Sequence, residues 1–505
     1  MQKQAMYEMH KYWGKKPGGL IGEYINKYSK VNDVVLDPFS GYGVIACEAL
    51  LNRRNVIAND LNPISNFLNY NLLNKEISFD ELDLIWNQIK SEFKSYNDEW
   101  YSCFRDGKRF EVISTLRSKD DIPYKIKYKG EKNNIEKLLS VDEINAILEK
   151  EKHAIIEDWY PKELLIENSR ISAKKGMTVE CLFTKRELSC LSRLLALIEK
   201  YSKGSTVNSL LKMAFTANLA NCSKLVPPIK SRGEMSQGAW MTGFYIGETY
   251  IENNVLHYYE NRLKKVINGK KQYISMMQEN NCIYRITHND CCDLSDLKDG
   301  SIDYVLTDPP YGDVVPYFEQ SIIWNSWLKK HVDYDKEIVI SDAKNRNKQL
   351  KQYSNDIDRA YSEIYRILKN GSYFTFTFHS VYGTTWKAII NACLKNGFEF
   401  IDLRWMVQAT FSPRQLNRRY TIKGDLIITL KKNQYTMKLR KISACELELE
   451  ILELLKKNIG IYDTNELYLQ IISYIFKNRY YISNLNIIDL LNTNFEMRDG
   501  KWIIK

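Results

Sequence analysis

The tetrad Asp308-Pro309-Pro310-Tyr311 carries groups that could bind a flat base with an exocyclic amine. It follows the apolar run SIDYVLT, which is typical of a buried strand, and ligands of open parallel sheets bind at the carboxyl ends of strands. Because proline has no N–H, the Pro309 carbonyl is free to accept a hydrogen bond, and the Asp308 carboxylate is a second acceptor. Tyr311 adds a ring on which a base could stack. Taken alone, the four residues could also form a turn that only ends a strand.

A second motif, Asp37-Pro38-Phe39-Ser40-Gly41-Tyr42-Gly43, follows another apolar run and precedes a helical pattern. Glycines after a strand let a ligand approach the backbone closely. Asp60 ends the next apolar run, where an acid can bind ribose hydroxyls. This order of strand, glycine turn, helix, strand and acid predicts the first half of a nucleotide-binding unit. The turn has only two glycines, which disfavours a NAD-dependent enzyme.

Together, the two motifs resemble those of the S-adenosylmethionine-dependent amino-methyltransferases of DNA, in the bacterial branch with a large insertion between the second and third motifs. In that family the first motif holds the cofactor and DPPY holds the target amine. The run HKYWGKKP at 10–17 resembles the segment that contacts the methionine end of the cofactor, and HND at 288–290 resembles the motif that contacts its adenine. The cofactor-binding residues implied by the resemblance are Tyr12, Lys16, Asp37, Pro38, Phe39, Gly41, Gly43, Asp60 and Asp290. The implied catalytic residues are Asp308, Pro309, Pro310 and Tyr311.

The reaction implied by the resemblance is methyl transfer from S-adenosylmethionine to the exocyclic amine of a flipped-out DNA base. By the same resemblance, Asp308 favours the N6 amine of adenine, since serine at that position goes with cytosine N4. Cytosine-N4 transfer, an RNA guanine-amine methyltransferase and a non-catalytic DNA-binding subunit are left open as alternatives. Relatives carry a zinc ribbon early in the insertion, but residues 100–135 hold only Cys103, so no metal site is expected.

Basic and aromatic residues gather in the middle of the chain, between residues 222 and 271. Lys and Arg contact phosphates, and side chains on a positioned loop read bases. For any single lysine, a solvated charged face is the alternative interpretation. A further basic stretch, residues 412–419, lies where the resembled family has its eighth motif. The candidate DNA-binding residues are Lys224, Lys230, Arg232, Arg262, Lys264, Lys265, Arg414 and Arg418.

Strands alternate with helices in the two parts of the chain that carry these motifs, which predicts a parallel sheet with helices on both faces. The middle of the chain has short strand-like pieces and then a helical periodicity, including a charged helix over 252–272. The expected fold class is α/β. It comprises a Rossmann-like methyltransferase sheet, a large and mostly helical insertion, and a C-terminal helical module. A winged-helix fold and a plain helical cap are both open for that module, whose last residues carry a hairpin signal at Asp499-Gly500.

We expect four units along the chain. Residues 1–98 form the first half of the methyltransferase domain and residues 282–435 the second half. Residues 99–281 form the insertion, the expected target-recognition domain, and residues 436–505 form the C-terminal module.

Composition limits the remaining choices. The 505 residues include 72 Lys and Arg against 62 Asp and Glu, a net charge of +10 that suits a nucleic-acid partner. Because 44% of the residues are hydrophobic, wholesale disorder is excluded, and no apolar run is long enough to span a membrane. The first residues lack the apolar region of a signal peptide, so we expect a cytoplasmic protein. Duplex DNA is the expected partner, and a restriction or defence-system partner is left open.

Overall fold

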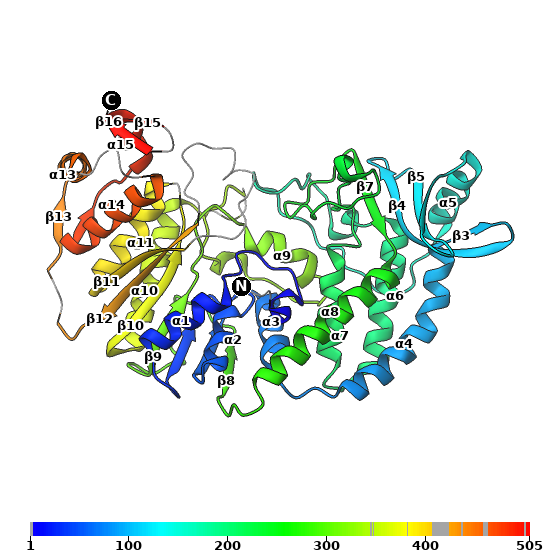
Figure 1. Ribbon diagram of the computed structural model, residues 1–505, viewed down its shortest axis with the longest axis horizontal. Helices are drawn as coiled ribbons and strands as arrows, with labels where there is room; N and C mark the ends of the chain where they lie inside the picture. The colour runs from blue at the N-terminus through cyan, green and yellow to red at the C-terminus, as the bar shows by residue number, and fades with distance from the viewer. Residues whose placement is uncertain are drawn as a thin grey trace.

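A seven-stranded sheet is assembled from two stretches of the chain that are separated by the insertion, residues 99–281 (Figure 1). The computed structural model describes residues 4–343, 346, 348–380, 382–406, 424–435, 438–457, 463–498 and 501–504. The strand order is β11-β12-β10-β9-β1-β2-β8. The strands are β1 (Val34–Asp37), β2 (Asn55–Asn59), β8 (Tyr284–Thr287), β9 (Ile302–Thr307), β10 (Leu368–Phe378), β11 (Phe398–Met406) and β12 (Asp425–Lys432).

Five of these strands, β8, β2, β1, β9 and β10, are parallel to one another, and β12 is antiparallel to both β10 and β11. β1 pairs with β2 on one side and with β9, from the second half of the chain, on the other. The order of the strands therefore reverses at β1, and such a reversal leaves a crevice at the carboxyl ends of the strands. The predicted α/β class with a Rossmann-like sheet is confirmed.

The two faces of the sheet are covered by different helices, because side chains alternate between the faces of a strand. Val35 packs in one core with α1 (Gly18–Tyr28), α2 (Val44–Leu51) and α3 (Pro63–Leu73). Leu36, its neighbour on β1, packs in the other core with α10 (Leu350–Ile367) and α11 (Gly383–Lys395). The alternating phenylalanines of β10 are buried in this second core, as their spacing predicts.

The insertion combines helices with an antiparallel sheet. Its helices are α5 (Val141–His153), α6 (Lys185–Ser202), α7 (Asn208–Leu219) and α8 (Val255–Met276), and α4 (Phe79–Trp100) leads into it. Its strands are β3 (Ser102–Arg105), β4 (Lys108–Ser118), β5 (Pro123–Lys129), β6 (Asn134–Leu138) and β7 (Thr249–Asn253). The helix expected over 252–272 is present but begins at Val255. The residues before Asn254 form β7, which pairs with β4.

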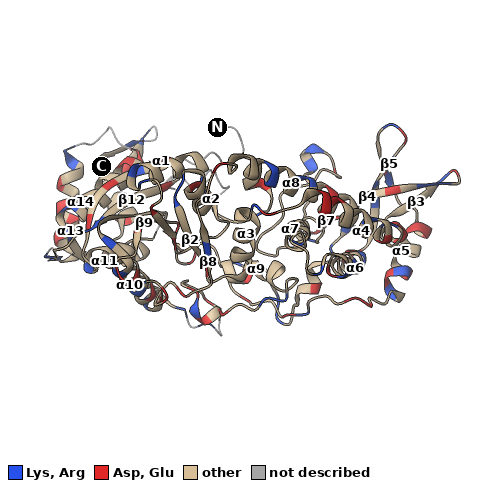
Figure 2. Ribbon diagram, turned by 90° about the horizontal axis from the view of Figure 1, so that it is seen from below, with Lys and Arg blue, Asp and Glu red and all other residues tan. Residues whose placement is uncertain are grey.

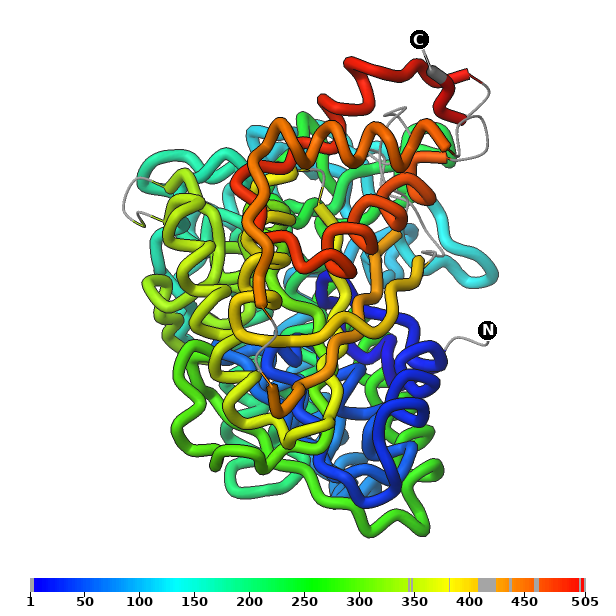
Figure 3. Tube along the Cα trace, turned by 90° about the vertical axis from the view of Figure 1, so that its left-hand side faces the viewer, coloured from blue at the N-terminus to red at the C-terminus, as the bar shows by residue number. Residues whose placement is uncertain are grey.

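The C-terminal module packs against the second half of the sheet (Figure 3). α14 (Thr464–Asn478) lies on β11, where the rings of Phe400 and Phe476 stack with their centroids 5.4 Å apart. The module also contains β13 (Arg440–Ile442), α13 (Ala444–Lys456), β14 (Tyr480–Ile482) and α15 (Ile487–Asn494). β15 (Phe495–Arg498) and β16 (Lys501–Ile504) form the predicted hairpin. The winged-helix assignment stays a prediction.

Within the described ranges, no helix is long and apolar enough to cross a membrane. In the same part of the chain, no group of three or more His, Cys, Asp or Glu side chains could hold a metal ion. All ten cysteines are free thiols.

Candidate active site

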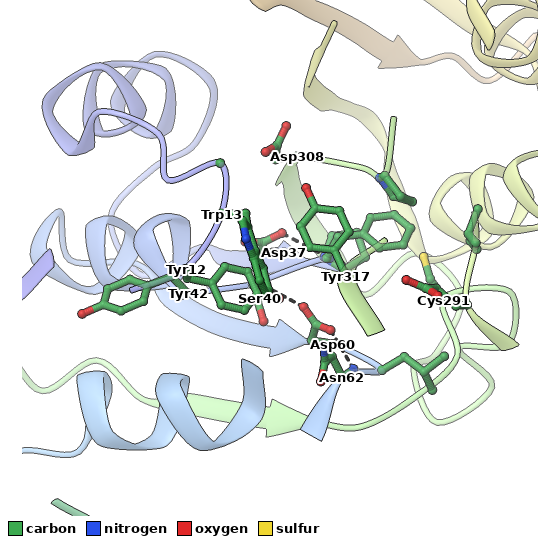
Figure 4. A pocket seen from close by; sticks show the side chains of 18 of the residues that line it. Tyr12, Trp13, Asp37, Ser40, Tyr42, Asp60, Asn62, Cys291, Asp308 and Tyr317 are labelled. Carbon is green, nitrogen blue, oxygen red and sulfur yellow. Dashed lines mark hydrogen bonds between the residues drawn. The ribbon is translucent and has the colours of Figure 1, made fainter. Parts of the chain in front are cut away.

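A cavity lies at the carboxyl ends of β1, β2 and β9, where the order of the strands reverses (Figure 4). The motifs from both halves of the chain meet there. The sequence-predicted residues that line it are Tyr12, Lys16, Asp37, Pro38, Phe39, Gly41, Asp60, Asp290, Asp308 and Pro310. Gly43, Pro309 and Tyr311 lie outside this lining.

Asp37, at the end of β1, is buried with 1% of its surface exposed. Its Oδ1 accepts hydrogen bonds from the Thr307 hydroxyl (2.7 Å) and the Phe39 backbone N–H (3.3 Å). Burial raises the pKa of Asp37 to about 8, and the neighbouring charges of Asp60 and Asp308 add to that rise. An empty site therefore favours the protonated acid, and a cation bound beside it would favour the carboxylate.

The glycine turn between β1 and α2 brings the backbone close to both the cavity and α3. Gly41 has a φ of +49°, and a Cβ there would lie 3.0 Å from the Tyr12 ring. Gly43 has a φ of +94° and begins α2, and a Cβ there would lie 2.5 Å from Asn69 Oδ1. Gly43 thus shapes the turn rather than lining the cavity.

Two further acids follow β2 and β8. Asp60 accepts the Gly41 N–H at Oδ2 and the Asn62 N–H at Oδ1, both at 2.8 Å, and burial raises its pKa. The Ser65 side chain also hydrogen-bonds this carboxylate, which leaves one of its four lone pairs for a ligand. Asp290 accepts the Cys292 N–H at Oδ1 (2.9 Å). Both acids can therefore receive hydroxyl or amino groups of a nucleoside.

Asp308 follows β9 and stands in a network of polar side chains. Its Oδ1 accepts hydrogen bonds from the hydroxyls of Tyr311 and Thr377. Its Oδ2 lies 3.0 Å from the Lys16 ammonium, which lies 2.9 Å from Asp425 Oδ2. Burial raises the pKa of Asp308, and Lys16 opposes that rise. Two carboxylates thus hold the Lys16 ammonium. The resemblance implies that Lys16 contacts the cofactor and does not imply these two ion pairs.

Tyr311 lies beside Asp308 with its ring edge-on to Phe378, at a centroid distance of 5.2 Å. Its hydroxyl also accepts a hydrogen bond from Lys16 (3.0 Å). The Pro310 carbonyl accepts the Tyr353 hydroxyl (2.9 Å). The stacking role predicted for Tyr311 stays a prediction.

The sequence reasoning did not assign several residues of the site. Trp13 lines the cavity, and its buried indole N–H has no hydrogen-bond partner among the described residues. Tyr317, at the start of α9 (Tyr317–Asn325), stacks on Tyr12 at 6.4 Å. Trp13 belongs to the run HKYWGKKP, so that motif could have indicated that Trp13 lines the site. No signal in the sequence pointed to Asp425, because it belongs to a strand that is distant from the motifs along the chain.

The basic candidates fall into three groups. Lys224 is paired with Asp121 at 2.6 Å and has 13% of its side chain exposed, so it is not free to meet a phosphate. Lys230 and Arg232 on a short 3-10 helix, and Lys264 and Lys265 on α8, are exposed, and Arg262 is half-buried. Arg414 and Arg418 lie outside the described residues.

A family model described as DNA methylase matches residues 2–65 and 302–483 of this chain. The resemblance drawn from the motifs is therefore confirmed, and the unmatched middle, residues 66–301, includes the whole of the expected insertion. A comparison with curated proteins gives no match.

Several solved structures are similar to parts of this chain. One is a provisionally named DNA modification methylase from Thermus thermophilus, complexed with S-adenosyl-L-methionine (15% identity, 34% of this chain, 59% of the other, TM-score 0.19). Another is an rRNA methyltransferase from Streptomyces viridochromogenes (9% identity, 83% of this chain, 86% of the other, TM-score 0.27). A third is a phosphoethanolamine N-methyltransferase from Haemonchus contortus (11% identity, 86% of this chain, 100% of the other, TM-score 0.19). This chain therefore spans 59% of the length of the Thermus protein.

Proposed function

Because the two matched segments of this chain belong to the DNA methylase family, we propose that the protein transfers a methyl group from S-adenosylmethionine to the N6 amine of adenine in DNA. The observation that carries the proposal is the position of Asp308. Its carboxylate borders the same cavity as the acids of the glycine turn and of β2, so an amine acceptor and a nucleotide-like cofactor can meet there.

The cavity fits S-adenosylmethionine by charge and by shape. The cofactor carries an ammonium and a sulfonium, and Asp37 and Asp308 are acids whose raised pKa values a cation would lower. Asp60 keeps one lone pair for a ribose hydroxyl beside its bonds to Gly41, Asn62 and Ser65. The unpartnered Trp13 N–H is a donor for a carboxylate or another acceptor of the ligand. Bound in this way, the cofactor supplies an electrophilic methyl group.

Asp308 would accept a hydrogen bond from the amine through the remaining lone pair of Oδ2. That bond orients the nitrogen lone pair toward the methyl carbon, and such positioning lowers the barrier of an in-line displacement. The new C–N bond forms as the C–S bond breaks, and the electron pair of the C–S bond stays on sulfur. The methylated nitrogen, now a cation, then passes one proton to the Asp308 carboxylate that accepts its hydrogen bond, and Asp308 releases this proton to solvent. No cysteine nucleophile is needed, and the cysteine nearest to the motifs, Cys291, has a raised pKa because it is buried.

The base must leave the duplex to reach this cavity, since its exocyclic amine is otherwise stacked and paired. Extrusion costs a few kcal/mol, which base stacking and phosphate contacts have to offset. We assign the phosphate contacts to the exposed cations of the insertion, Lys230, Arg232, Lys264 and Lys265, and keep residues 99–281 as the proposed target-recognition domain. Asp308 at the first position of DPPY is the reason for choosing adenine over cytosine.

Single-molecule sequencing of a plasmid from a methylase-free host that expresses this chain tests the proposal. The expected result is N6-methyladenine at one recurring sequence, with an unmodified plasmid from the Asp308→Ala control. N4-methylcytosine at a recurring sequence would replace adenine by cytosine in the proposal. An unmodified plasmid, from a folded protein that binds S-adenosylmethionine, would overturn DNA as the substrate and direct the search to RNA.

A further inference from the structure

A second hollow lies beside the cavity and shares a wall with it. Tyr12, Trp13 and Lys15 line both hollows. The far side of the second hollow is formed by Lys11 together with Trp240 and Thr242 of the insertion. A ligand that enters the catalytic cavity past Trp13 would therefore place its neighbouring groups in this second hollow.

Three cations, Lys11 of this hollow and two residues of α8, lie close to one another, and Glu8 also lines the hollow. The Lys11 ammonium lies 5.6 Å from the centroid of the Trp240 ring and donates a hydrogen bond to Asn221 Oδ1 (3.0 Å). Arg262 and Lys265 of α8 are close enough to repel Lys11. No acidic side chain of the described residues forms an ion pair with any of the three. Burial, and after it this repulsion, lowers the pKa of Lys11 to about 7.

The other titratable groups of the hollow are already engaged. His10 is buried between Thr216 and the Lys11 carbonyl, and burial lowers its pKa to about 3, so it is neutral. Lys15 donates to the Tyr7 and His10 carbonyls and lies 3.6 Å from the centroid of the Tyr42 ring. The Glu8 carboxylate favours the charged form of Lys15 and so raises its pKa, against the effect of burial. Lys11 in the hollow, with Arg262 and Lys265 of α8 near it, therefore forms a group of cations that makes no ion pair with an acidic side chain of the described residues.

The hollow is held in place by the packing of the N-terminal segment on α8. A Cβ on Gly269 would lie 2.5 Å from Met9 Cγ, and the Met6 N–H donates to Gln272 Oε1 (3.2 Å). Figure 2 shows α8 on the same side of the molecule as the N-terminus. The three cations are thus brought together by two elements that pack closely.

We propose that Lys11, Arg262 and Lys265 bind a backbone phosphodiester of the strand that carries the target base. This assignment rests on the proposed function, because it takes the ligand of the first cavity to be an extruded nucleotide. An anion at this point would relieve the repulsion among the three cations, and cations of this kind hold the register of a nucleic acid without reading its sequence. Trp240 supplies an aromatic face next to the same phosphate.

A chemical double-mutant cycle tests the proposal on the full chain. The probe is a duplex that contains the sequence found by plasmid sequencing, with single neutral methylphosphonate linkages placed in turn on each side of the target base. For the wild type, one neutral linkage is expected to weaken binding about tenfold. For the double variant Lys11→Gln and Arg262→Gln, the all-phosphate duplex should bind about tenfold more weakly, and the same neutral linkage should cost nothing further.

The control is Arg285→Gln, which removes one positive charge from an exposed arginine of β8 that pairs with Asp296. It should respond to the neutral linkage as the wild type does. Unchanged affinity of the double variant for S-adenosylmethionine shows that the fold is intact. A variant that stays as sensitive to every neutral linkage as the wild type would overturn the subsite. A wild type that neither methylates nor binds the duplex would instead overturn the proposed function.

Discussion

At the scale of single residues, Lys16 governs whether Asp308 can act as an acceptor. Its ammonium lies between Asp308 and Asp425, at 3.0 and 2.9 Å. Burial raises the pKa of Asp308 and Lys16 lowers it, so loss of the cation would raise that pKa further. We expect Lys16→Gln to move the acidic limb of the pH–kcat profile to higher pH, with kcat on that limb about tenfold lower for a shift of one pH unit.

The pH–kcat profile also separates two roles for this lysine. Lys16→Arg keeps the positive charge, so its acidic limb should stay close to that of the wild type. An equal loss of activity at every pH, with weaker binding of S-adenosylmethionine, would mean that Lys16 contacts the cofactor, as the sequence resemblance implies, and does not tune Asp308.

Asp37 should make the stability of the ligand-free protein depend on pH. Its pKa is about 8 in the folded state, against an ordinary value of 3.8. The folded protein therefore holds a proton that the unfolded chain releases, and stability falls as the pH rises through this window. Over three pH units this loss is at most about 4 kcal/mol. Asp60 and Asp308 also face this group and titrate with it.

The variant Asp37→Asn removes this proton without changing the size of the side chain. Urea unfolding between about pH 5 and pH 8 should show a flatter dependence for the variant than for the wild type. Binding of S-adenosylmethionine at pH 7 should release protons from the wild type, measured by calorimetry in buffers of different ionisation enthalpy, and fewer from the variant. Identical slopes and identical proton release would remove Asp37 from the electrostatics of the cavity.

At the scale of elements, the turn between β1 and α2 depends on Gly43. Asn69 of α3 donates to Ser40 Oγ, to the Gly41 carbonyl and to the Ser65 carbonyl, and so holds the turn against α3. A Cβ on Gly43 would lie 2.5 Å from Asn69 Oδ1 at a φ of +94°. We expect Gly43→Ala to lower the unfolding free energy by about 2–3 kcal/mol and to weaken cofactor binding, measured by urea unfolding and calorimetry.

Gly300 is the matched control for this prediction. Its φ is also positive, at +59°, but a Cβ there would meet nothing within 4 Å. Gly300→Ala should therefore show only the cost of the backbone conformation, about 1 kcal/mol, with normal cofactor binding. If the two variants lose the same stability, the contact with Asn69 does not hold the turn.

The elements that the sequence could predict are those whose signals are local. The unit from β1 to β2 was predictable because an apolar run, a glycine turn, an apolar helix and a terminal acid follow one another along the chain. β7 was missed because its five residues become a strand only by pairing with β4, far earlier in the sequence. The contact of Lys16 with Asp308 and Asp425 was missed for the same reason, since three distant segments form it.

At the scale of the whole molecule, the insertion touches the loop that follows the DPPY motif. Arg170 of the insertion forms an ion pair with Asp313, only a few residues after Asp308. The neighbouring Ser169 N–H donates to Asp342 (3.0 Å), and Asn168 donates to Glu319 (3.3 Å). These contacts therefore connect the proposed target-recognition domain directly to the loop that follows the DPPY motif.

A double-mutant cycle on Arg170 and Asp313 measures this connection. Arg170→Gln and Asp313→Asn should each lower kcat by about threefold to tenfold, with unchanged affinity for S-adenosylmethionine, because the loop after DPPY loses a point of attachment. The double variant should lose little more than either single variant, since contacting residues are coupled. The exposed pair Lys395 and Asp358, which joins α11 to α10, is the control and should leave kcat unchanged. Losses that multiply in the double variant would mean that the two residues act separately and that the ion pair transmits nothing between the insertion and the catalytic loop.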